Sequence, residues 1–183
     1  TRNVKQTLMK KRFTNLAWSG LLLACLLCNC SIPDSNHLTI EKNSHILLIG
    51  NNLCSRMMNY GHFETELHLR YPDSNLYIRN MCDGGNTAGF RPHSGRKSPW
   101  AFSGADQFQL SEFTRNSGSK GDFETPDEWL TRLEADVILA FFGYSESFRG
   151  EEGLEDFKNE LRAFVDHSLA QQYNSDTTLQ LAL

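Results

Sequence analysis

The fold is indicated most clearly by residues 45–53, which read His45-Ile-Leu-Leu-Ile49 and then Gly50-Asn51-Asn52-Leu53. An unbroken apolar run that ends at a glycine is typical of a strand buried on both faces of a parallel sheet. Apolar residues then recur at roughly helical spacing as far as residue 67, with a glycine at position 61 that should break or kink the helix. This stretch therefore predicts a strand, a tight turn and an interrupted helix.

The alternation of strand and helix continues along the chain. Residues 76–80 and 136–142 are two further candidate strands, and 178–183 begin another apolar run. Two helices are predicted in addition: one begins at 125–128, and an amphipathic helix extends over 154–169. The segment 88–122 has no clear period and is predicted to be a long surface excursion, with one short helix near 106–113. The pattern predicts an α/β fold with a doubly wound parallel sheet, flavodoxin-like and three-layered (α/β/α), which we expect to be truncated on its C-terminal side.

The N-terminal residues have the pattern of an export signal. A basic segment begins at Met9 and is followed by an apolar run of about 13 residues (16–28), too short for a helix to cross a bilayer core of ~30 Å. We expect 1–8 to be a non-native upstream extension and 9–30 a signal peptide, with a short membrane anchor as the alternative. Residues 22–25 also fit a lipobox with Cys25 as the lipidated residue, and this leaves lipoprotein and ordinary cleavage equally open. The expected location is the periplasm, the outer membrane or the medium.

The charge and the cysteine content of the chain bear on whether it binds nucleic acid, forms a disulfide or holds a metal ion. Residues 1–30 carry five of the 18 basic residues and no acid, which leaves 13 basic against 22 acidic residues in the rest. With this excess of acidic residues, the chain after residue 30 is not expected to present the basic surface that nucleic-acid binding requires. Cys54 and Cys82 lie outside the signal segment, and an oxidising compartment could pair them. No metal-ligand spacing is present, so we expect no metal and no other cofactor, and the sequence favours no oligomeric state.

Three loops follow the three predicted strands, at residues 50–53, 80–87 and 142–148. They contain Gly-Asn-Asn-Leu, Asp-Gly-Gly-Asn and Phe-Gly-Tyr-Ser-Glu-Ser-Phe. In order, spacing and placement they resemble the first three blocks of the SGNH (GDSL) hydrolases, namely a Gly-Asp-Ser-Leu turn, a glycine and Gly-x-Asn. The resemblance extends over residues 40–183 and is nearest to a branch found in large exported bacterial proteins.

The resemblance implies a hydrolase that acts on ester bonds, with an acylated carbohydrate as a candidate substrate. In such a site the nucleophile stands at a strand-to-helix turn, and amide groups form an oxyanion hole for the developing charge. Asn52 occupies the nucleophile position, and Gly85 and Ser145 occupy the oxyanion-hole positions. The candidates for substrate binding are Asn51, Asn86 and Glu146.

The chain departs from the family at decisive positions. Asn52 offers an amide where the family has a serine, Ser145 replaces an asparagine, and the Asp/His block is expected beyond residue 183. Cys54 and Ser55 follow within one helical turn and should point away from position 52, while His167 comes too early to match the catalytic histidine. Two functions follow: an esterase-type hydrolase with a degenerate nucleophile position, or a non-catalytic binding or scaffold module of an exported multidomain protein. The expected partner is a small-molecule or carbohydrate ester, with membrane contact only through a lipid anchor.

Overall fold

Four parallel strands form the sheet at the centre of the fold. They are β1 (His45–Gly50), β2 (Tyr77–Asn80), β3 (Val137–Phe141) and β4 (Gln180–Ala182), and they lie in the order β2-β1-β3-β4. The structure is a computed structural model that describes residues 37–109 and 121–183, of which Leu38–Leu183 belong to one compact unit. The predicted strands are therefore present, and the sheet is parallel as expected.

The register places the carboxyl ends of all four strands at one end of the sheet. Ile46 of β1 lies opposite Ile78 of β2 on one side and Val137 of β3 on the other, and Gly50 lies opposite Phe141. The chain moves outward from β1 to β2 in one direction and from β3 to β4 in the other. The loops after β1 and β3 thus diverge at a topological switch point, where α/β sheets bind their ligands.

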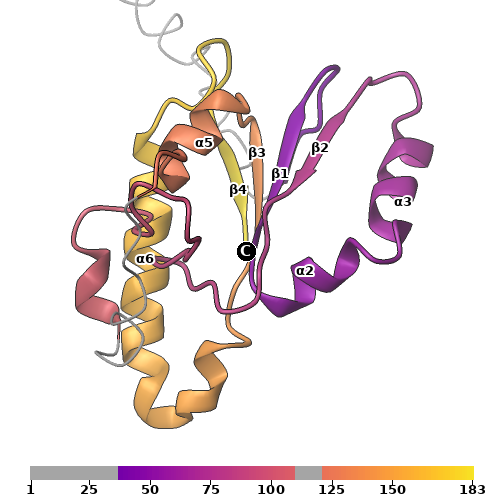
Figure 1. Cartoon of the computed structure of the whole chain (residues 1–183). Coiled ribbons are helices and arrows are strands. Elements are labelled where there is room, and N and C mark those ends of the chain that lie inside the picture. The colour runs from indigo at the N-terminus through magenta and orange to yellow at the C-terminus, as the bar shows by residue number, and fades with distance from the viewer. Residues whose placement is uncertain (1–36, 110–120) are drawn as a thin grey trace, which may run out of the picture. The chain divides into compact units, whose positions relative to one another are not determined.

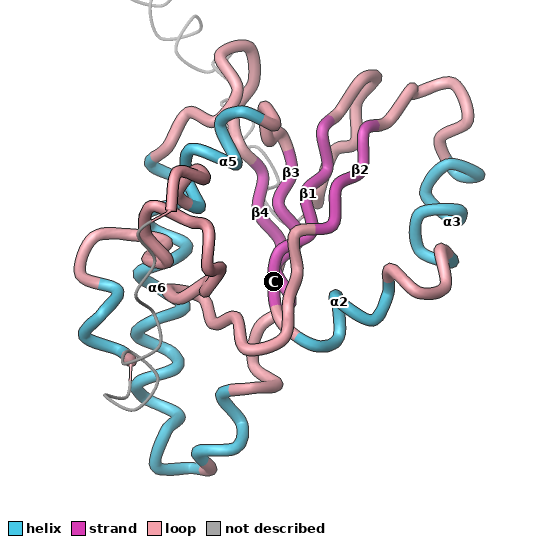
Figure 2. The backbone as a smooth tube through the Cα atoms, viewed as in Figure 1, coloured by secondary structure: helices cyan, strands magenta, loops and turns pink. Residues whose placement is uncertain are grey.

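Helices cover both faces of this sheet (Figures 1 and 2). On one face lie α2 (Asn52–Met57) and α3 (His62–Arg70), and on the other lie α5 (Pro126–Arg132) and α6 (Leu154–Ala170). The predicted break at Gly61 is confirmed, because this residue has a left-handed backbone and is the N-cap of α3. The three-layer α/β/α prediction is confirmed as well.

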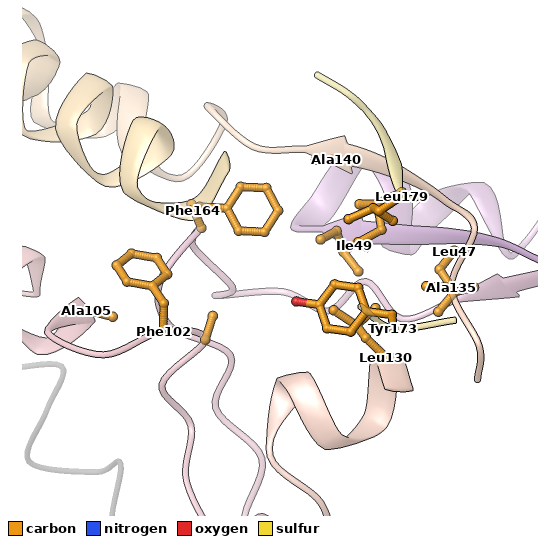
Figure 3. Close-up of a cluster of buried hydrophobic side chains, with 13 residues drawn as sticks. Leu47, Ile49, Phe102, Ala105, Leu130, Ala135, Ala140, Phe164, Tyr173 and Leu179 are labelled. Atoms are coloured by element: carbon orange, nitrogen blue, oxygen red, sulfur yellow. The ribbon is translucent and has the colours of Figure 1, made fainter. Parts of the chain in front are cut away.

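The larger core lies between the sheet and α5 and α6 (Figure 3). Leu47 and Ile49 of β1 pack there with Leu130 of α5 and Phe164 of α6, each 1% exposed or less. Phe102 brings part of the predicted excursion into the same cluster. Each such side chain contributes about 1.5–3 kcal/mol of burial free energy, so this core holds the excursion as well as the helices on the sheet.

The smaller core lies under α2 and α3. The alternate side chains of β1, Ile46 and Leu48, pack there against Val137. A disulfide joins Cys54 of α2 to Cys82 in the loop after β2, with 5.7 Å between their Cα atoms. The pairing that the sequence left open is therefore present, and it ties the first loop region to the second.

Short helices complete the described chain. They are η1 (Ala105–Phe108), η2 (Glu146–Arg149) and η3 (Glu151–Gly153), all of the 3-10 type. The helix predicted near 106–113 is thus a 3-10 turn over its first residues, while 110–113 lie outside the described residues. The predictions for 1–8, 9–30 and Cys25 also fall outside them. Within the described ranges no helix is long and apolar enough to cross a membrane.

Candidate functional site

The three loops that the sequence singled out converge at the carboxyl end of the sheet. The Asn51 N–H donates to the Phe141 carbonyl (3.1 Å), which joins the loop after β1 to β3. The Gly50 carbonyl accepts from the Asp83 N–H (3.1 Å) and from Asn86 Nδ2 (3.0 Å), which joins the same loop to the one after β2. These hydrogen bonds therefore fix the first loop against the end of β3 and against the second loop.

Gly50 permits this close approach. Its φ is +149°, and a β-carbon at this position would stand 2.3 Å from the Phe141 carbonyl oxygen. Only glycine fits both the backbone conformation and the space. The glycine that ends the first strand thus sets how closely the candidate nucleophile turn lies against β3.

Position 52 is the first residue of α2 and carries no hydroxyl or thiol. A β-carbon at Gly84 would lie 3.0 Å from Oδ1 of Asn52, so the amide lies directly against the second loop. Cys54 is buried and its sulfur is engaged in the disulfide, which removes it as a substitute nucleophile. Neither the side chain at position 52 nor the thiol of Cys54 can therefore attack a carbonyl carbon.

Asn51 and Glu146 connect the first loop to the third. Asn51 is 1% exposed, and its Nδ2 donates to Glu146 Oε2 (3.4 Å), which also accepts from the Gly143 N–H (2.9 Å). Burial raises the pKa of the Glu146 carboxyl above its ordinary value, against the lowering effect of hydrogen bonds from its own backbone and from Gly143. Asn51 Oδ1 and Glu146 Oε1 are buried without a hydrogen-bond partner among the described residues. These are acceptors to which a ligand could donate.

A pocket of about 430 Å³ opens beside this connection. Gly85, Ser145 and Glu146, three of the predicted site residues, contribute to its lining. Of the other three, Asn86 is buried under the loops (3% exposed), Asn52 lies against Gly84, and Asn51 lines a neighbouring pocket of about 330 Å³. The structure therefore brings together the two oxyanion-hole candidates and one substrate-binding candidate.

Several lining residues of the pocket were not singled out from the sequence, and among them is a buried carboxyl, Glu160 of α6. This side chain is 4% exposed, and its Oε1 accepts from Thr87 Oγ1 (2.5 Å), the Gly89 N–H (2.8 Å) and Gln109 Nε2 (3.3 Å). Burial raises the pKa of this carboxyl too, although the three donors act in the opposite direction. The sequence does hold a signal: an acidic residue on the apolar stripe of α6, four positions before the core residue Phe164.

No family model, curated protein or solved structure matches this chain. The relationship to the SGNH hydrolases therefore stays a prediction that rests on the residues of the three loops.

The chemistry of this pocket is set by hydrogen-bonding groups and carboxyls. No histidine belongs to its lining within 37–109 and 121–183. His167 lies instead on α6 at 2.7 Å from Asp127 Oδ2 of α5, a contact that ties the two helices together. Across the described chain there is no group of three His, Cys, Asp or Glu side chains placed to hold a metal ion. The described lining therefore offers hydrogen-bonding groups and carboxyls but no imidazole of the kind that activates a serine.

Proposed function

We propose that this domain is a ligand-binding module on an SGNH-like scaffold that does not hydrolyse esters by a serine mechanism. The proposal rests on the absence of a nucleophile at the turn after β1. Asn52 stands where the SGNH hydrolases have a serine, and the neighbouring Cys54 is held in a disulfide. Gly85 and Ser145 nevertheless line a pocket of about 430 Å³. The site thus keeps its binding surface without the group that would form an acyl intermediate.

An esterase-type hydrolase is the second candidate, and one observation favours it. Ser145 lines the pocket beside Glu146, whose pKa burial raises. A serine hydroxyl next to a carboxyl is the minimum arrangement for nucleophilic attack with a carboxylate base. This candidate would place the nucleophile in the third loop and not in the first.

Ester hydrolysis by a small set of variants separates the two candidates. We would assay the protein on p-nitrophenyl acetate and on acetylated sugars beside Asn52→Ala, Asn52→Ser and Ser145→Ala. Ser147→Ala is the matched control, because its exposed hydroxyl donates to the Tyr144 carbonyl and is absent from the pocket lining. We expect the unmodified protein, Asn52→Ala and Ser145→Ala to hydrolyse these esters equally slowly.

The expected result follows from the size of a nucleophile's contribution. Removal of a catalytic serine costs about 10⁶-fold in rate, so replacement of a functioning nucleophile is easy to detect. Turnover by the unmodified protein that falls at least about 10³-fold in Ser145→Ala, but not in Ser147→Ala, would establish the esterase candidate and refute the binding module.

A further inference from the structure

Aromatic rings and carboxyls dominate the wall of the pocket beside the third loop. Phe90, Phe108 and Phe148 line it together with Glu146 and Glu160. Phe90 and Phe108 come from the excursion, whereas Phe148 lies on η2 and is 77% exposed. The pocket thus combines a buried aromatic wall, an exposed aromatic rim and two acidic groups.

The two carboxyls keep acceptor capacity that the protein does not use. In Glu160 one oxygen takes all three hydrogen bonds, and Oε2 accepts none from the described residues. In Glu146 the buried Oε1 has no partner among them either. Each anion is therefore partly desolvated and only half satisfied, which is costly unless a positive group lies nearby.

Neither Glu146 nor Glu160 forms an ion pair with a basic side chain of the described residues. Only longer-range attraction reaches Glu160: the charge of Arg149 lowers its pKa, and Glu160 in turn raises the pKa of the buried Arg91. Arg149 is the one basic side chain in the described part of the lining, and its guanidinium donates to Asp156 Oδ2 at 2.6 Å. The negative charge of Glu160 raises the pKa of Glu146, in addition to the larger effect of burial. The charge of Glu160 thus adds to the cost of ionising Glu146, and both residues line the same pocket. A cation bound there would lower the cost of ionising both carboxyls.

We propose that this pocket binds an organic cation, an alkylammonium group held between the phenylalanine rings and the carboxylates of Glu146 and Glu160. Ring faces attract alkylated ammonium ions through their negative quadrupole, and the attraction grows when the site is desolvated. The carboxylates add long-range attraction without requiring an N–H donor. The inference rests on the proposed binding function and names the class of ligand that this function would serve.

Choline and its uncharged carbon analogue, 3,3-dimethylbutan-1-ol, test the inference by isothermal titration calorimetry at neutral pH and matched ionic strength. The two probes have nearly the same shape, so a difference in their affinity reports the positive charge. We expect choline to bind at least about tenfold more tightly than the alcohol. We also expect Glu160→Gln and Phe148→Ala each to weaken choline binding about tenfold or more.

Two features of the design keep the outcome informative. Phe148 is an exposed side chain, so Phe148→Ala tests the rim even if Glu160→Gln disturbs the excursion. Glu151→Gln is the charge-matched control, because it removes an exposed carboxylate of η3 that does not line the pocket, and it should bind choline as the unmodified protein does.

Each failure has its own signature. Equal affinity for choline and the alcohol would overturn the cation inference and leave the binding module standing. Choline affinity that survives in both pocket variants would overturn the assignment to this pocket. Absence of binding by either probe would refute the inference, and Ser145-dependent ester turnover would refute the proposed function itself.

Discussion

Replacing Gly50 by alanine should destabilise the domain more than any other single added methyl group at this end of the sheet. The new β-carbon would meet the Phe141 carbonyl oxygen at 2.3 Å and its carbon at 2.8 Å. This carbonyl also accepts the Asn51 N–H at 3.1 Å. Because both groups are backbone, no side-chain rotation can relieve the contact, and β1 and β3 would have to separate.

The magnitude has two parts. A φ of +149° places alanine in a sparsely populated region, which costs about 1–3 kcal/mol. Forcing a methyl group into filled space costs a further ~1–3 kcal/mol, so the sum is about 2–6 kcal/mol. Against a typical stability of ~5–15 kcal/mol, this loss is large enough to measure and in the upper range would leave the domain largely unfolded.

Gly61→Ala is the matched control, because Gly61 also has a positive φ (+62°) but has no atom within 4 Å of the added β-carbon. It should lose only the conformational part, about 1–2 kcal/mol. Urea unfolding followed by circular dichroism would give both values from the same preparation. If the two variants lose the same stability to within ~0.5 kcal/mol, the close approach of Gly50 to β3 is wrong.

Three further perturbations test other parts of the structure. Replacing both Cys54 and Cys82 by serine should cost about 3–4 kcal/mol in urea unfolding, since the bond closes a loop over a sequence separation of 28; an unchanged midpoint would contradict the pairing. Burial raises the pKa of Glu160 in the folded state above its ordinary value of 4.5, which means that the fold favours the protonated carboxyl. The resulting stabilisation of the folded protein is complete below pH 4.5 and is lost as the pH rises through the folded-state pKa. Glu160→Gln should therefore gain stability relative to the unmodified protein as pH rises, and a constant difference would refute this. Thr125→Ala, which removes the oxygen that caps the Glu128 N–H, should cost about 1 kcal/mol by thermal unfolding, whereas Thr131→Ala (exposed, outside the cap) should cost less.

Much of the fold could be predicted because its elements carry local signals. The strand at 45–49 is an unbroken apolar run, and residues of its two alternating sets face the two cores, Leu47 on one side and Ile46 on the other. Gly61 marked the boundary between α2 and α3 because a left-handed residue cannot continue a helix. Thr125 likewise marked the start of α5 through a capping box that needs only neighbouring residues.

The candidate site was predictable only where it follows directly from a strand. Gly85 and Ser145 lie in loops that leave β2 and β3, and the topology alone brings those loops together. Phe108 and Gln109 come from the excursion, whose sequence has no period, so no local pattern places them beside α6. Their position depends on hydrogen bonds to Glu160 and on packing of Phe102 into the core, which are long-range interactions.

Under the proposed function, the binding pocket does not depend on the side chain at position 52. The turn at position 52 joins β1 to α2, whereas Glu160 holds part of the pocket lining through its contacts with Thr87, Gly89 and Gln109. Asn52 lies against Gly84 and makes no contribution to the lining. A substitution at position 52 therefore leaves the wall and its charges in place, and selection could act on ligand binding independently of ester chemistry.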